Sequence, residues 1–254
     1  MPLTVETFPT IAEAGRALAA SRSARFLGGG TLLMRAVNEA DPSFDRLIRT
    51  TDPSLREIRA TGAGLTLGAH VTMAMLLASR DAAFLAPVAR VVGGPQVRSA
   101  ATVAGNLFAE RPYGDFAGAL LALGASVITA DGRRDSIEEL MRPGGGQRPL
   151  IASIEVPVPQ DALLLRKVSR VKPKGVSVLS IAAVLPRRGG RIEGARVVFT
   201  GMGPRPMRAP GAERALNGQT LDPGVIERAA AAAAEGLSPV DDALATAWYR
   251  REVA

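Results

Sequence analysis

The sequence of 254 residues contains no cysteine and a single histidine, His70. Without cysteine the chain forms no disulfide, has no thiolate nucleophile and cannot ligate an iron–sulfur cluster through thiolates of its own. One histidine excludes a zinc site built from several histidines, and a serine–histidine–carboxylate triad would have to use His70. Because His70 directly follows residues 65–69, which alternate like a strand, we interpret it as a structural histidine.

Aromatic residues are also scarce, at 4% of the chain, whereas the net charge is +7. A basic chain suggests a nucleic-acid partner, but base stacking needs aromatic platforms that this sequence hardly supplies. The densest basic run, residues 166–174, is typical of a solvated face or of a contact with an acidic subunit. We therefore expect no nucleic-acid partner. The alternative, a basic nucleic-acid-binding protein, would be tested by salt-dependent binding to DNA or RNA.

Long apolar runs are missing as well, since none approaches the ~20 residues of a membrane-spanning helix. The N-terminal segment MPLTVETFPT lacks the charged-then-apolar pattern of a secretory signal. We expect a cytoplasmic protein without a membrane span. The length suffices for one large domain or two smaller ones.

The order of strand-like and helix-like segments predicts an α+β fold. Up to about residue 160 short strands alternate with helices, and Thr10-Ile11-Ala12-Glu13 predicts a capping box at the first helix. The sequence pattern changes at 157–161. Beyond it, three successive strand patterns occur without intervening helices, at 163–171, 176–185 and 192–202, and they predict an antiparallel sheet. We divide the chain into domains 1–160, with subdomains of about 1–53 and 54–160, and 161–254.

The C-terminal part ends in helices, which we predict at about 212–216, 223–235 and 242–252. Trp248 and Tyr249 lie in the last of these segments. Since both side chains are large and apolar, we expect them to pack this helix against the rest of the domain.

A glycine triplet, Gly28-Gly29-Gly30, follows the apolar run 24–27 and precedes a helix pattern at 32–37. A strand, a glycine loop and a helix in this order point backbone N–H groups at a phosphate. The triplet is not a P-loop, since no Gly-Lys-Ser/Thr follows, and it is not the G-x-G-x-x-G of a Rossmann fold. From these residues alone, a phosphate loop and a simple turn both remain open.

The central stretch of the sequence, residues 93–130, opens with GGPQVRSAATVAGNLFAERPYGD, which is rich in small residues that expose the backbone. Long irregular segments inside a compact domain are uncommon and usually functional. Asp115 is a good N-cap for a helix at 116–123, and a carboxylate there suits a ligand hydroxyl better than a phosphate. A surface loop with a capping aspartate fits the same residues, so both interpretations stay open.

Taken in order, the motifs resemble those of the FAD-binding (medium) subunits of molybdenum hydroxylases, the carbon monoxide dehydrogenase and xanthine dehydrogenase type. The resemblance extends along nearly the whole chain. Its two flavin loops correspond to Phe26-Leu27-Gly28-Gly29-Gly30-Thr31-Leu32-Leu33 and to Thr102-Val103-Ala104-Gly105-Asn106-Leu107 with Pro112-Tyr113-Gly114-Asp115. Further matches are Gly94 to Arg98, Ser153 to Pro157, Arg166 to Arg170, Asp241-Asp242 and Tyr249-Arg250-Arg251.

The resemblance implies a two-part FAD-binding domain of the molybdopterin dehydrogenase type, followed by a C-terminal domain with a three-stranded antiparallel sheet and helices. It implies non-covalent FAD, with the pyrophosphate cradled by Gly28, Gly29, Gly30, Thr31, Thr102, Gly105 and Asn106. Leu32 and Leu33 would line the first loop, and Ala109 and Gly114 the second. Asp115 would accept from a ribose or ribityl hydroxyl, and Ile151 and Lys167 would lie near the ring system.

The resemblance also implies an oxidoreductase subunit with no catalytic residue or metal of its own, since flavin carries the redox step. Electrons would come from a molybdenum cofactor through two [2Fe-2S] clusters, all on partner subunits. The implied partners are a large molybdenum subunit and a small iron–sulfur subunit, in a heterotrimer or a dimer of heterotrimers. The organic substrate and the final acceptor, whether NAD, oxygen or a quinone, stay open.

The chain departs from the family pattern at four places, and two of these departures, Leu32 and Ala104, support an alternative, a relative that has lost FAD and serves as an assembly or interaction subunit. Leu32 stands where many relatives have a polar residue, and Ala104 replaces a usual second glycine. Glu110-Arg111 is a charged pair where small residues are common, and Gly175 stands where aspartate is frequent. Ala104 is compatible with a flavin loop if its φ is negative.

Overall fold

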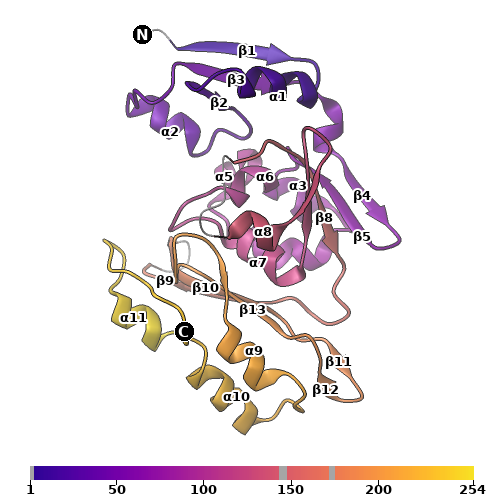
Figure 1. Cartoon of the computed structure of the whole chain (residues 1–254), viewed down its shortest axis with the longest axis vertical. Helices are drawn as coiled ribbons and strands as arrows, with labels where there is room; N and C mark the ends of the chain where they lie inside the picture. Colours follow the sequence, from indigo (N-terminus) through magenta and orange to yellow (C-terminus); the bar gives the residue numbers. More distant parts are fainter. Residues whose placement is uncertain (1–2, 143–147, 172–174) are drawn as a thin grey trace.

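The computed structural model describes residues 3–142, 148–171 and 175–254, and its elements confirm the predicted α+β class (Figure 1). The first unit is a parallel sheet of order β1-β3-β2 with two helices. Thr10 caps its first helix by accepting from the Glu13 amide at 3.2 Å. Only this half of the predicted capping box forms, because Glu13 Oε2 has no partner among the described residues. The bounds are β1 Thr4–Phe8, α1 Ile11–Ala19, β2 Ala24–Phe26, α2 Leu33–Asn38 and β3 Arg46–Thr50.

The central unit is an antiparallel sheet of order β4-β5-β8-β6-β7 with short helices around it. Its strands are β4 Ile58–Thr61, β5 Gly64–Gly68, β6 Ser126–Thr129, β7 Arg134–Ser136 and β8 Ile151–Pro157. Its helices are the 3₁₀ turns η1 Pro53–Arg56 and η2 Ala83–Leu85, then α3 Met73–Ala78, α4 Ala86–Val91, α5 Pro95–Ala100, α6 Val103–Leu107, α7 Asp115–Leu123 and α8 Ile137–Met141. The segment from residue 93, which we expected to be irregular, therefore contains two short helices, α5 and α6.

The C-terminal unit is an antiparallel sheet of order β14-β13-β10-β9 with helices packed on it. The three predicted strands are present, and a two-residue strand, β14, adds a fourth at the edge. Its strands are β9 Leu164–Ser169, β10 Ser177–Val184, β13 Arg196–Thr200 and β14 Met207–Arg208, with a hairpin of β11 Arg187–Arg188 and β12 Arg191–Ile192. The helices are α9 Pro210–Leu216, α10 Pro223–Ala231 and α11 Ala247–Glu252.

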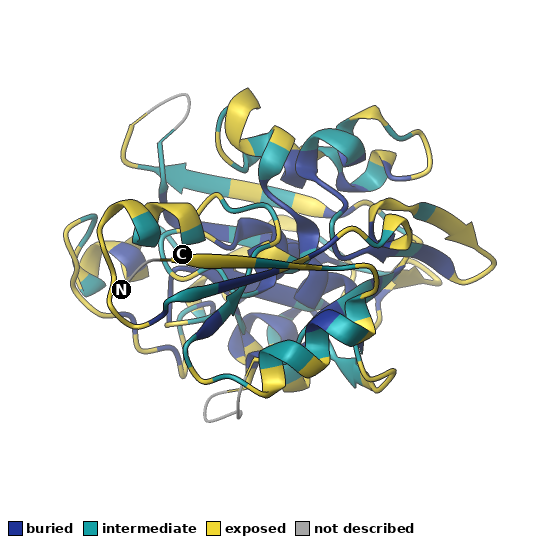
Figure 2. Ribbon diagram, turned by 90° about the horizontal axis from the view of Figure 1, so that it is seen from above, coloured by how far each residue is buried: buried dark blue, intermediate teal, exposed yellow. Residues whose placement is uncertain are grey.

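Helix α7 joins the last two units. Every one of its residues is buried, and it packs on β10 and β13 as well as on β8. Figure 2 shows the buried residues concentrated in the middle of the molecule, with the exposed ones on the outer helices and strand edges. The main core therefore includes apolar side chains from both units, such as Phe116, Leu120, Ile154 and Val198.

The expected packing of the last helix is wrong. Trp248 is 68% exposed and Tyr249 is 40% exposed, whereas Arg250 is only 1% exposed. The Arg250 guanidinium donates to the carbonyls of Val178 and Val240 and binds both carboxylate oxygens of Asp242 at 2.8 Å. The buried Arg250, and not Trp248 or Tyr249, therefore holds α11 against the C-terminal sheet.

The end of the basic run, residues 172–174, lies outside the described residues. Among the helices that the structure describes, none combines the length and the apolar character needed to cross a membrane. Nor does the described part bring three or more histidine, aspartate or glutamate side chains together as a metal site.

Candidate functional site

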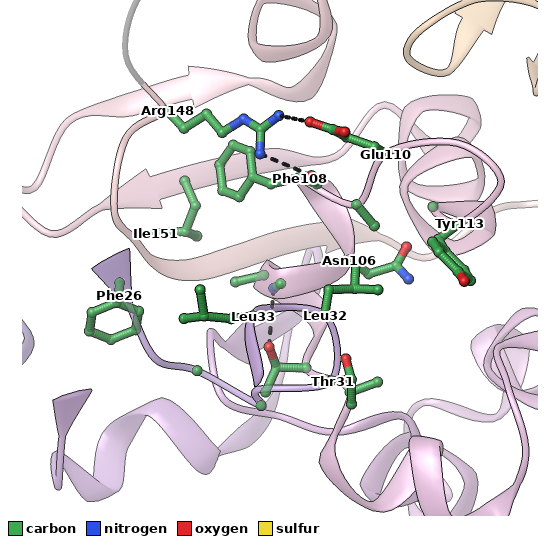
Figure 3. A pocket seen from close by; sticks show the side chains of 18 of the residues that line it. Phe26, Thr31, Leu32, Leu33, Asn106, Phe108, Glu110, Tyr113, Arg148 and Ile151 are labelled. Carbon is green, nitrogen blue, oxygen red and sulfur yellow. Dashed lines mark hydrogen bonds and ion pairs between the residues drawn. The ribbon is translucent and has the colours of Figure 1, made fainter. Parts of the chain in front are cut away.

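A cleft of about 2860 Å³ lies where the three units meet. It is lined by the loops after β2 and around α6, by the start of β8 and by β9 (Figure 3). All fourteen residues predicted as site residues line this cleft: Gly28, Gly29, Gly30, Thr31, Leu32, Leu33, Thr102, Gly105, Asn106, Ala109, Gly114, Asp115, Ile151 and Lys167. Segments up to 139 residues apart in the sequence thus contribute to one surface.

The first glycine loop lies directly against the connection between α5 and α6. A Cβ atom on Gly29 would overlap the carbonyl oxygen of Ala100, and Gly30 has a φ of +71°. Glycine is required at both positions, the first for the close approach of two backbones and the second for a left-handed conformation. This packing leaves the loop backbone exposed to the cleft with no side chain in front of it.

The second loop is held by its own side chains. Thr102 caps α6 by accepting from the Gly105 amide at 3.1 Å. Asn106 is 8% exposed, and its Oδ1 accepts from the Ala117 amide in the first turn of α7 at 3.1 Å. Both residues therefore fix the loop geometry, whatever further group they bind.

Asp115 does not cap α7, so that prediction is wrong. Gly114, with a φ of +98°, is the N-cap, and Asp115 is the first helical residue. Its carboxylate, 5% exposed, accepts from the hydroxyls of Ser177 and Ser180 at 2.7 Å and from the Lys167 ammonium at 3.0 Å. The aspartate thus connects α7 with β9 and β10.

Sequence spacing gave no sign of these serine partners. Residues three apart in a regular strand point to opposite faces of the sheet. In β10 the register with β9 shifts between Ser177 and Leu179, and this irregularity lets Ser177 and Ser180 reach the same carboxylate. Lys167 also donates to the carbonyl of Val91 at 3.1 Å, which fixes its ammonium group at the wall of the cleft.

Comparison with known proteins assigns the chain to a family. Residues 4–159 match the family described as FAD binding domain in molybdopterin dehydrogenase. The chain belongs to this family. Residues 165–254 match a second one, the CO dehydrogenase flavoprotein C-terminal domain. The resemblance to the FAD-binding medium subunits of molybdenum hydroxylases, which are oxidoreductase subunits, is thereby confirmed.

Relatives cover almost the whole chain. It is 24% identical to the glyceraldehyde dehydrogenase medium chain of Sulfolobus acidocaldarius, over 96% of this chain and 91% of that protein. It is 26% identical to the carbon monoxide dehydrogenase medium chain of Afipia carboxidovorans, over 91% and 85%. A chain of carbon monoxide dehydrogenase from Hydrogenophaga pseudoflava shares the fold, with a TM-score of 0.92 at 23% identity, over 100% and 93% of the two chains.

The alternative of a relative that has lost FAD gains no support from these matches, because the matched FAD-binding domain includes both glycine loops. The structure also accounts for two of the departures from the family pattern. Ala104 lies inside α6, and the described non-glycine residue with a positive φ is Ala40, so Ala104 is unstrained. A Cβ on Gly175 would overlap the carbonyl of Val171, so this backbone contact excludes a larger residue there.

Glu110, another departure, belongs to a cluster that sequence reasoning missed. The Arg148 guanidinium lies 5.8 Å from the centroid of the Phe108 ring. It donates to the Phe108 carbonyl at 3.2 Å and to Glu110 Oε1 at 3.1 Å (Figure 3). Arg111, which follows Glu110 in the sequence, lies with its Nη1 atom 3.6 Å from Oδ2 of Asp242. Both charges of the pair therefore have partners across the rim of the cleft.

The residues of the cleft fit FAD. The first loop lines the cleft with three consecutive glycines, so these residues can offer only backbone atoms to a ligand. Basic side chains outnumber acidic ones along the walls, which suits a diphosphate. Apolar side chains suited to a ring system also face the cleft, among them Leu33, Phe108 and Ile151 (Figure 3).

Proposed function

We propose that this chain is the FAD-binding electron-transfer subunit of a multi-subunit molybdenum hydroxylase. It would take electrons from iron–sulfur clusters on a partner and pass them through non-covalent FAD to an external acceptor. The observation that supports this most strongly is the convergence of the fourteen family positions on one cleft, from loops that are distant in the sequence. FAD, when bound, supplies the redox chemistry, and the chain's own residues bind it and exclude water.

The family resemblance gives each of these residues a role in the proposal. The two glycine loops would hold the diphosphate through backbone N–H groups, with Thr31, Thr102 and Asn106 beside them. Leu32, Leu33, Ala109 and Gly114 would line the loops, and Ile151 and Lys167 would lie near the ring. Asp115 would accept from a ribose or ribityl hydroxyl only alongside its three present donors.

The remaining assignments belong to the same proposal. The flavin domain would comprise residues 1–160, with subdomains of about 1–53 and 54–160, and residues 161–254 would form the C-terminal domain. The partners would be a large subunit with the molybdenum cofactor and a small subunit with two [2Fe-2S] clusters, in a cytoplasmic heterotrimer or dimer of heterotrimers. Alone, the chain would oxidise no organic substrate, since the pocket for it would lie on another subunit.

The visible absorbance spectrum tests the central part of this proposal. The purified chain is measured before and after addition of FAD and desalting, and again after denaturation. We expect a retained flavin spectrum in stoichiometric amount, with free FAD released on denaturation. A folded chain that remains colourless, both alone and in complex with its co-expressed partner subunits, would contradict the proposal.

A further inference from the structure

The single histidine has a nitrogen without a partner. His70 lies at the wall of the cleft, and its backbone amide donates to the Leu55 carbonyl at 2.7 Å. Its side-chain Nε2 is shielded from solvent and forms no hydrogen bond with any described residue. Burial of a polar atom without a partner is unfavourable, so such an atom marks a place where a partner from outside the chain fits.

The unpartnered nitrogen lies near the place where the two glycine loops meet. A Cβ atom on Gly28 would lie 4.0 Å from His70 Nε2 and 3.5 Å from Thr102 Oγ1. Both polar atoms thus lie beside the position that a side chain of residue 28 would occupy, and glycine leaves that position empty. The Thr102 hydroxyl accepts from the Gly105 amide and donates to no described residue, so it too has a hydrogen bond to offer.

The surroundings keep this imidazole oriented and neutral. Burial, followed by the nearby Arg56, lowers the pKa of His70, and Arg49 acts in the same direction while Asp52 opposes it. A neutral imidazole carries one N–H donor and one acceptor nitrogen. The Phe26 ring lies 5.8 Å away, centroid to centroid, and restricts the plane of the imidazole.

We infer that His70 is a further residue of the cofactor site, whose Nε2–H donates a hydrogen bond to a phosphate oxygen of the FAD diphosphate, beside Thr102 and the first glycine loop. Phosphate oxygens at neutral pH are acceptors, so this assignment places the proton of the imidazole on Nε2. The inference rests on the proposed function, and it replaces the interpretation of His70 as purely structural.

A chain with one histidine allows a direct test by NMR. Protein labelled with ¹⁵N-histidine is titrated with FAD, with ADP, which has the diphosphate but no flavin, and with riboflavin, which has the flavin but no phosphate. We expect FAD and ADP to shift the Nε2 signal of His70 and to stabilise the Nε2–H tautomer, and riboflavin to leave it nearly unchanged.

Two results would overturn the inference while leaving the proposed function intact. One is FAD retained in stoichiometric amount with an unchanged His70 signal, and the other is a shift by riboflavin as large as that by ADP. If the folded chain retains FAD neither alone nor in complex with its partner subunits, the proposed function fails, and the ADP titration still decides whether His70 faces a diphosphate.

Variants separate this role from a structural one. His70→Phe keeps a planar ring but removes the donor, and should weaken FAD binding about tenfold. His70→Gln, which keeps an N–H donor, should restore part of the affinity, and riboflavin binding should change in neither variant. Equal losses for FAD and riboflavin would indicate a structural histidine and would refute the inference, provided that circular dichroism shows both variants folded.

Discussion

The carboxylate of Asp115 lies 3.0 Å from the ammonium group of Lys167, and the two side chains are only 5% and 16% exposed. The pair joins the first turn of α7 in the central unit to β9 in the C-terminal unit. It also places a cation at the wall of the cleft, 3.1 Å from the Val91 carbonyl. The contact that connects the units therefore also shapes the site.

Asp115→Asn should destabilise the chain by about 3 kcal/mol, because the change leaves the Lys167 ammonium nearly buried without a counter-charge. Urea unfolding measures the loss as a lower midpoint at an unchanged slope. Glu39→Gln is the matched control, since both side chains of the Arg35–Glu39 pair are more than 60% exposed and the pair should contribute little to stability. Equal effects of the two substitutions would contradict the role given to Asp115.

Arg250→Met should release α11. The substitution removes the donors of the Val178 and Val240 carbonyls and leaves Asp242 without its cation, at a cost of about 3 kcal/mol. The neighbouring Arg251, which is exposed, should tolerate alanine within about 0.5 kcal/mol. Limited proteolysis at the C-terminus, together with thermal unfolding, checks this; resistance of the Arg250 variant to cleavage would show that other contacts hold the helix.

His70 should make the stability of the FAD-free chain depend on pH. Burial and Arg56 lower its pKa in the folded state, so the unfolded chain takes up a proton first as the pH falls. The stability it contributes is complete above the unfolded pKa of about 6.5 and is lost as the pH falls towards the folded value. Unfolding of the wild type and of His70→Phe is compared from pH 7.5 to 5.5. The wild type should lose more stability than the variant as the pH falls. A larger loss of stability for His70→Phe would contradict this account.

Trp248 provides a reporter of the outer face of α11. The only tryptophan of the chain is 68% exposed, so its fluorescence should resemble that of free tryptophan and be quenched efficiently by iodide. Trp248→Ala should change the free energy of unfolding by less than about 0.5 kcal/mol. Blue-shifted emission protected from iodide in the isolated chain would show that the helix packs inward.

The parts of the site that depend on local backbone chemistry could be predicted from the sequence. Both loops can be recognised in the sequence at Gly28–Gly30 and Thr102–Asn106, because only small residues and a capping threonine suit those backbones. The partners of Asp115 could not be predicted, since a local register shift in β10 brings Ser177 and Ser180 to one face. The burial of Arg250 was equally hidden, because its acceptors are mostly backbone carbonyls, which no side-chain pattern reveals.

Binding of FAD to two matched glycine variants tests the central claim most directly. Gly29→Ala places a Cβ onto the Ala100 carbonyl and must displace the first loop, whereas Gly62→Ala, in the hairpin between β4 and β5, meets nothing within 4 Å. Titrations followed by flavin fluorescence should show wild-type affinity for Gly62→Ala and a loss of at least about tenfold for Gly29→Ala, with both variants folded. If a folded Gly29→Ala protein bound FAD as tightly as the wild type, the first glycine loop would not be part of the flavin site.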